Sequence, residues 1–144
     1  MIITVDTNIL FSSLNSKLGA SYQILKLIMD EKLQLAISTP AYFEYYDVLM
    51  RPENLEKFKL SIEEVEDILD LLALRAKKHS IYFLLRPNLS DENDNIFVEC
   101  AFASNSKYIV TSNTKDYKNS ELIGFPFEIV TSGEFLKIWR KNHE

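Results

Sequence analysis

Short runs rich in β-branched residues alternate along this chain with longer segments of helical periodicity, and this alternation restricts the fold more than any other feature. The predicted strands are Ile2–Val5, Gln34–Ile37, Ile81–Leu84, Tyr108–Thr111 and Phe127–Val130. Most of them are apolar on both faces, a pattern that indicates a buried parallel sheet. The predicted helices are Ala20–Glu31, Pro40–Met50, Ile62–Lys78, Asp91–Ser104 and Ser132–Lys141. The alternation predicts an α/β fold, a three-layer sandwich around a central parallel sheet.

Two of these helices have marked starts. Thr39 followed by Pro40 predicts a cap and a first-turn proline, and Thr131 with Glu134 three residues later is a capping-box pattern. No stretch rich in proline or glycine interrupts the alternation, since the chain has 3 Gly and 4 Pro among 144 residues. We therefore expect a single domain over residues 1–144.

Composition excludes several classes of protein. The apolar runs are shorter than the roughly 20 residues that span a bilayer, and the amino terminus lacks the pattern of a signal peptide. We therefore expect a cytoplasmic protein without a membrane segment. The single cysteine, Cys100, excludes an internal disulfide framework and a thiolate zinc site, and the 2 His make an imidazole-rich metal site equally unexpected.

The net charge of −5 argues against a general basic clamp for nucleic acid. The acidic residues are unevenly distributed, because five of them lie within one predicted helix and their summed charge equals the net charge of the chain. They are Glu63, Glu64, Glu66, Asp67 and Asp70. We interpret this run as a solvated helix face, which leaves an anionic substrate elsewhere compatible with the overall charge.

Polar residues follow the first and fourth predicted strands directly. Asp6-Thr7-Asn8 comes after Ile2–Val5, and Ser112-Asn113-Thr114-Lys115-Asp116 comes after Tyr108–Thr111. Open parallel sheets bind ligands outside the carboxyl ends of their strands, where the strand order reverses. We therefore expect a site at this edge of the sheet.

Two carboxylates in the first half of the chain are candidates for that site. Asp6 ends the first strand, where it either caps the following helix or joins a site. Glu44 has apolar or aromatic neighbours on both sides, and a carboxylate near a buried face needs a metal or a partner such as Arg51. Asp47, one turn later, is either a substitute for Glu44 or a solvated helix residue.

The segment Ser90–Asn95 brings further oxygen donors to the first turn of a predicted helix, where the helix dipole favours carboxylates. Asp91 is more readily an N-cap than a ligand. Asp94 completes a capping box with it or acts in a site together with Asp6 and Glu44. Farther along this helix we expect Glu99 at the surface and Cys100 in the core.

Oxygen ligands from several separate elements, without a His or Cys cluster, suit a hard divalent cation such as Mg²⁺ or Mn²⁺. Such ions polarise a phosphodiester and activate water. The residues therefore predict metal-assisted chemistry on a phosphate ester.

At this point the chain resembles the PIN-domain (PilT N-terminus) ribonucleases over nearly its whole length. The resemblance is carried by Val5-Asp6-Thr7-Asn8-Ile9-Leu10, by Glu44 within Ser38–Pro52, by Asp91-x-x-Asp94-x-x-Phe97, and by Ile109-Val110-Thr111-Ser112-Asn113 with Asp116. It implies the strand order 3-2-1-4-5 and the cleavage of single-stranded RNA with Mg²⁺ or Mn²⁺. Asp6, Glu44 and Asp94 match the three acids that hold the metal in that family.

The fourth acidic position of the family has two candidates here. Asn113 stands where many members carry Asp, and Asp116 stands three residues later, where others place it. The resemblance makes Asp116 the fourth catalytic and metal-binding residue, with Asn8, Asp91, Thr111 and Asn113 in supporting positions.

The branch that the chain resembles most comprises toxins of toxin–antitoxin pairs. This implies an RNA substrate and a cognate antitoxin. We also expect a homodimer, because Tyr42–Tyr46 and Ile68–Leu74 offer more apolar surface than one small sheet needs. The alternative is a PIN-fold binding or scaffold module with weak or no catalysis, which Asn113 and the acidic net charge favour. A haloacid dehalogenase-type phosphatase needs an acid where this chain has Asn8, and a receiver domain needs adjacent acids at the end of the first strand.

Overall fold

A five-stranded parallel sheet organises the protein, whose computed structural model describes residues 1–79, 92–118 and 126–143. Its strands are β1 (Ile2–Val5), β2 (Gln34–Ser38), β3 (Lys77–His79), β4 (Tyr108–Val110) and β5 (Glu128–Val130). They lie in the order β3-β2-β1-β4-β5, and each neighbouring pair is parallel. This order agrees with the one that the resemblance implied.

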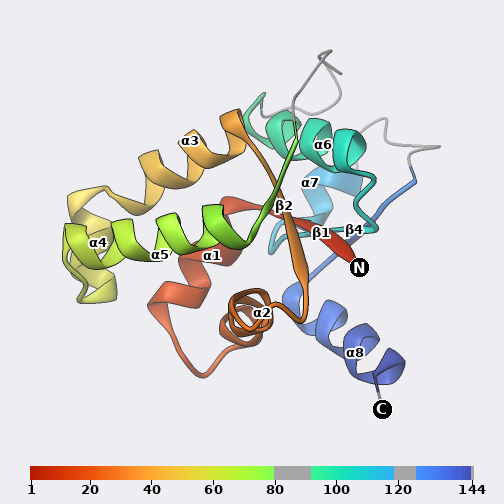
Figure 1. Ribbon diagram of the computed structural model, residues 1–144, viewed down its shortest axis with the longest axis horizontal. Coiled ribbons are helices and arrows are strands. Elements are labelled where there is room, and N and C mark those ends of the chain that lie inside the picture. Colours follow the sequence, from red (N-terminus) through yellow and green to blue (C-terminus); the bar gives the residue numbers. More distant parts are fainter. Residues whose placement is uncertain (80–91, 119–125, 144) are drawn as a thin grey trace.

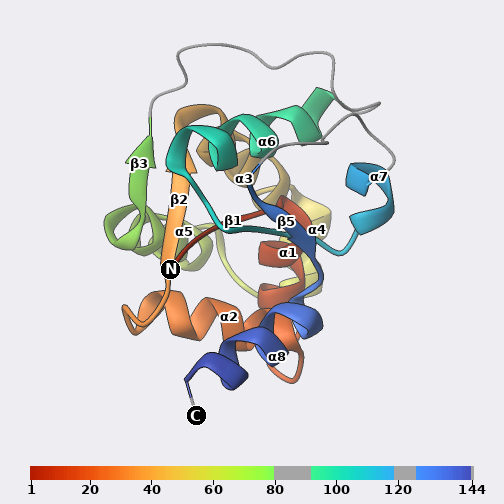
Figure 2. The same cartoon turned by 90° about the vertical axis from the view of Figure 1, so that its right-hand side faces the viewer.

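Helices cover both faces of this sheet. They are α1 (Thr7–Asn15), α2 (Ala20–Met29), α3 (Thr39–Leu49), α4 (Pro52–Phe58), α5 (Ile62–Arg75), α6 (Glu92–Ser104), α7 (Thr114–Lys118) and α8 (Ser132–Asn142). Helices α3, α4 and α5 extend to one side of the sheet in Figure 1. Figure 2 shows α6 above the sheet and α2 and α8 below it, which confirms the predicted three-layer α/β fold.

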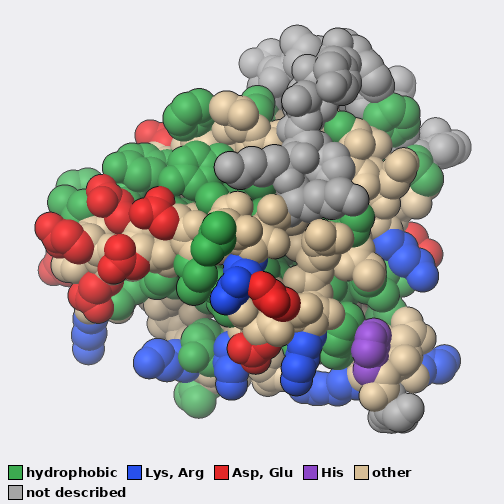
Figure 3. Space-filling view, in the orientation of Figure 1, with side chains coloured by type: hydrophobic (Ala, Val, Ile, Leu, Met, Phe, Trp, Pro, Cys, Tyr) green, Lys and Arg blue, Asp and Glu red, His purple; other side chains and the backbone are tan. Residues whose placement is uncertain are grey.

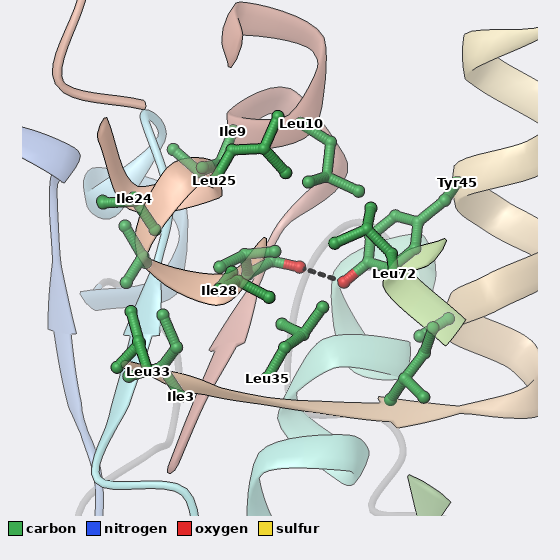
Figure 4. Packing of buried hydrophobic residues seen from close by; sticks show 14 of the residues in the cluster. Ile3, Ile9, Leu10, Ile24, Leu25, Ile28, Leu33, Leu35, Tyr45 and Leu72 are labelled. Atoms are coloured by element: carbon green, nitrogen blue, oxygen red, sulfur yellow. Dashed lines mark hydrogen bonds between the residues drawn. The ribbon is translucent and has the colours of Figure 1, made fainter. Parts of the chain in front are cut away.

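The strands are apolar on both sides because both sides are buried. Tyr108 and Val110 of β4 pack into the larger core, whereas Ile109 between them packs with Val98 and Ala101 of α6. Alternate residues of a strand point to opposite faces, so one strand supplies both clusters. Figure 4 shows part of the larger core, in which β1, β2, α2 and α5 meet.

The helix starts agree with the sequence at one of the two positions. Thr131 and Glu134 form the predicted capping box at the start of α8, with Thr131 Oγ1 accepting from the Glu134 N–H at 3.1 Å. At α3 the first-turn proline is confirmed, but the predicted cap was wrong by one residue, because Ser38 is the cap and accepts from the Ala41 N–H at 3.2 Å. Thr39 is instead the first residue of the helix.

The third strand begins earlier than its sequence suggests. The predicted helix Ile62–Lys78 ends at Arg75, and Lys77–His79 pair in parallel with Ala36–Ser38 of β2. The hydrogen bonds that the edge of β2 offers outweigh the helical preference of this segment. The strand predicted at Ile81–Leu84 lies outside the described residues.

Two short helices were not expected from the sequence. Helix α4 has Pro52 in its first turn and ends at Phe58, and its C-cap Lys59 has a left-handed φ of 59°. Helix α7 follows β4 after three residues. Helices of five to seven residues carry too few apolar positions for a periodic pattern, so only the folded chain shows them.

The acidic run predicted as a solvated helix face lies at the surface of α5. Glu63, Glu64, Asp67 and Asp70 are exposed, and Glu66 is half-buried. Acidic side chains gather at the end of the molecule that α4 and α5 form (Figure 3). Among the described helices, none has the length and apolar character of a membrane span.

Candidate functional site

The pairing of β1 with β4 brings the two polar segments together. Val5 is paired with Val110, and the ladder continues one residue farther, since the Asp6 N–H donates to the Val110 carbonyl at 2.9 Å. The Thr111 N–H in turn donates to the Val130 carbonyl at 2.9 Å. Asp6 and Thr111 therefore lie side by side where the strand order reverses, as expected for a ligand site in a parallel sheet.

One oxygen of the Asp6 carboxylate collects three side-chain donors. Oδ2 accepts from the Thr111 hydroxyl at 2.9 Å, from the Tyr117 hydroxyl at 3.1 Å and from Asn8 Nδ2 at 3.3 Å. The Asp6 residue is 7% exposed. It occupies the cap position of α1, but its side chain makes no capping hydrogen bond. The structure thus ties this carboxylate to Thr111 and Tyr117, which follow β4, as well as to Asn8 of its own helix.

Burial decides the protonation behaviour of this group. Loss of solvation raises the pKa of Asp6 above its ordinary value of 3.8, and the hydrogen bonds from Thr111 and Tyr117 lower it by less than burial raises it. A carboxylate held in this way is destabilised in its charged form. A bound cation would offset that cost.

A second carboxylate is connected to Asp6 through the loop after β4. Thr111 Oγ1, which donates to Asp6, accepts from the Asn113 N–H at 3.1 Å. Asn113 Nδ2 donates to Asp116 Oδ2 at 2.6 Å. The Ser112 N–H donates to Asn8 Oδ1 at 3.1 Å, which joins this loop to the start of α1. The two candidates for the fourth acidic position are therefore in contact, and Asn113 holds Asp116.

Glu44 is half-buried on α3, which starts where β2 ends at the same edge of the sheet. Tyr46 on this helix faces α5, because its hydroxyl donates to Glu66 at 3.4 Å. Asp70 of α5 contributes to the raised pKa of Tyr42, so Tyr42 faces the same way. Glu44 is two residues from each of them. Since each residue turns about 100° about a helix axis, Glu44 lies on the side of α3 away from α5.

Helix α6 reaches the same edge through aromatic packing. Phe97 stacks on Tyr45 of α3 with ring centroids 5.7 Å apart, and the Tyr45 hydroxyl donates to the Val5 carbonyl beside Asp6; Figure 4 marks this hydrogen bond with a dashed line. Asp94 is one turn before Phe97 on α6. Its side chain and the whole of Asp91 lie outside the described part of the structure, so both stay predictions.

The structure also tests the sequence interpretations of Asp47, Cys100 and Glu99. Asp47 is exposed and pairs with Arg51 at 3.0 Å, as a solvated helix residue does. Cys100 is buried in the core, as predicted. The expectation that Glu99 lies at the surface was wrong, because Glu99 is 3% exposed on the side of α6 that packs inward. A single helical turn of mixed polarity did not show which side faces the sheet.

Sequence reasoning missed Tyr117. This residue is fully buried, and its ring packs with Val98, Ala101, Ile109 and Phe127 while its hydroxyl reaches Asp6. The only signal was one aromatic residue within the polar segment that follows β4. That signal predicts burial of the ring, but the acceptor of its hydroxyl is defined only by the fold.

The donors at this edge fit a hard divalent cation. Carboxylate oxygens of Asp6 and Asp116 and amide oxygens of the asparagines are the ligands that Mg²⁺ and Mn²⁺ prefer. Among the side chains that the structure describes, no three His, Cys, Asp or Glu residues form a ready metal cluster. The described acids thus offer part of a donor set.

Comparison with known proteins agrees with this fold. The chain is similar to a chain in the crystal structure of VapBC2 from Rickettsia felis bound to a DNA fragment from their promoter, with a TM-score of 0.62 and 19% sequence identity. The similarity covers 91% of this chain and 98% of that one, and at this identity it shows the fold alone. No curated protein matches the sequence. The family model of the PIN domain matches residues 3–115, and the chain therefore belongs to the PIN-domain family.

Proposed function

We propose that this protein is a Mg²⁺- or Mn²⁺-dependent endoribonuclease that cleaves single-stranded RNA. PIN domains are in general divalent-metal-dependent nucleases. The observation that carries the proposal is the buried Asp6 carboxylate, which the hydrogen bonds of Thr111 and Asn113 connect to the carboxylate of Asp116. A buried charge of this kind, at the ligand-binding edge of the sheet, is typical of a catalytic site.

Four acids would hold the cation in this proposal, and each comes from a different element. They are Asp6 after β1, Glu44 on α3, Asp94 on α6 and Asp116 on α7. When bound, the cation would supply charge to a phosphodiester and activate water. The residues of the chain provide the rest: Thr111 and Asn8 orient Asp6, and Asn113 orients Asp116.

Isosteric amides test this proposal without removing volume. We expect Asp6→Asn, Glu44→Gln and Asp94→Asn each to abolish Mn²⁺-dependent cleavage of single-stranded RNA, because each removes a charge that the transition state requires. Asp116→Asn does less harm, since Asn113 still offers an oxygen beside it. Asp47→Asn is the matched control, because Asp47 is exposed on the same helix as Glu44. Near-normal turnover by the Asp6→Asn variant would refute the proposed mechanism.

We further propose that the protein is the toxin of a toxin–antitoxin pair and acts in the cytoplasm as a homodimer. The similarity in fold to a chain of VapBC2 supports this proposal. A pocket of carboxylates attracts an arginine as readily as a metal, so an antitoxin with a basic or aromatic segment would block it. Light scattering tests the dimer. Growth after expression of the chain, with and without the product of a neighbouring gene, tests the toxin and its inhibitor.

A PIN-fold binding module without catalysis is the second candidate. It is favoured by Asn8, which donates to Asp6, and by Asn113, which donates to Thr111, because neither side chain supplies a charge. A wild-type protein that binds single-stranded RNA but leaves it intact over a wide range of Mn²⁺ would decide for this candidate.

A further inference from the structure

The hydrogen bonds on Asp6 distinguish its two oxygens. Within the described part of the chain, Oδ2 accepts hydrogen bonds from the side chains of Thr111, Tyr117 and Asn8. Three side-chain donors on one oxygen restrict the rotation of the carboxylate, and backbone groups of Thr7 and Asn8 also hydrogen-bond to it. This arrangement fixes the orientation of the group.

Tyr117 has the geometry of a support for this orientation. Its residue is 0% exposed, and its ring is clamped among Val98, Ala101, Ile109 and Phe127. A ring packed on all sides has little freedom to move, so its hydroxyl is held at a fixed place. Removing a residue that hydrogen-bonds to a metal-ligating side chain typically changes the metal affinity 10–100-fold.

We propose that Tyr117 is a positioning residue, whose hydroxyl holds Oδ2 of Asp6 so that Oδ1 faces a divalent cation. This inference rests on the proposed role of Asp6 in metal binding. Tyr117 lies outside the residues that the PIN-domain model matches, which end at residue 115.

The test compares Tyr117→Phe with Tyr45→Phe. Both tyrosines are fully buried, but the hydroxyl of Tyr45 donates to the Val5 carbonyl and not to a carboxylate. Mn²⁺ binding is measured directly by electron paramagnetic resonance, and RNA cleavage is measured as a function of Mn²⁺. We expect Tyr117→Phe to raise the Mn²⁺ dissociation constant about tenfold. Turnover at saturating Mn²⁺ stays near that of the wild type, and Tyr45→Phe binds Mn²⁺ like the wild type.

Replacement by 4-aminophenylalanine, which keeps a donor at the same place, should restore the affinity. Should Tyr117→Phe fail to fold in EDTA, 4-fluorophenylalanine at this position removes the donor while keeping the volume, and its comparison with 4-aminophenylalanine gives the same readout.

The outcomes separate this inference from the function on which it rests. If the wild type binds Mn²⁺, Asp6→Asn does not, and Tyr117→Phe binds it unchanged, the positioning role is overturned while the metal site stands. Equal weakening by Tyr45→Phe also overturns it, because the effect would then reflect packing. A wild type that binds no Mn²⁺ overturns the metal site and the positioning role together.

Discussion

Replacing Thr111 by valine should measure how strongly the site depends on its central hydroxyl. Thr111 is 0% exposed, and its Oγ1 donates to Asp6 Oδ2 at 2.9 Å. Valine has nearly the same shape, so no cavity forms. A hydrogen bond to a charged group contributes about 1.5–3 kcal/mol, so we expect the free energy of unfolding at pH 7 to fall by about 2 kcal/mol. For a chain of this length that corresponds to a melting temperature lower by roughly 7 °C.

Two comparisons make this expectation specific. Thr4→Val removes an equally buried hydroxyl, which lies 2.8 Å from the neutral hydroxyl of Ser106, and should cost only about 1 kcal/mol. In the Asp6→Asn background the acceptor of Thr111 is neutral, so Thr111→Val should cost about 1 kcal/mol there as well.

Urea unfolding in EDTA, followed by circular dichroism, gives these free energies from the midpoint and slope of each transition. A Thr111→Val protein as stable as the wild type would refute the reasoning. So would an equal cost of this change in the presence and absence of the Asp6 charge, because the charge is the stated source of the large effect.

Three further predictions concern charge, packing and capping. Burial raises the pKa of Asp6 above 3.8, so the stabilisation by protonated Asp6 is full below that pH and is lost as the pH rises through the folded-state pKa. Urea titrations in EDTA should show this loss in the wild type, and an Asp6→Asn protein that shows it equally would contradict its assignment to Asp6. Phe97→Ala removes a buried ring that stacks on Tyr45 and should lower the free energy of unfolding, measured by calorimetry, by about 3–5 kcal/mol. A loss smaller than that caused by removing one buried methyl group would exclude a tight α3–α6 contact. Ser61→Ala breaks the capping box of α5 and should cost about 1 kcal/mol in the same urea assay, and an unchanged unfolding midpoint would show that the cap contributes nothing.

The sequence by itself determined the layers of the fold. Runs such as Ile2–Val5 are apolar at every position but one, and only a sheet covered on both faces buries them. The capping box at Thr131 was readable because its donors and acceptors lie within four residues. Asp6 was recognised as a site candidate for a similar reason, since its place depends only on the end of the strand before it.

The tertiary structure decided what depends on contacts between distant segments. The edge of β2 turned Lys77–His79 into a strand, against a helical pattern. The packing of α6 buried Glu99, and the fold of α7 brought the hydroxyl of Tyr117 to Asp6, 111 residues away along the chain. Local preferences differ by less than the free energy of a strand pairing or a buried hydrogen bond, and those interactions exist only when the remote partner is in place.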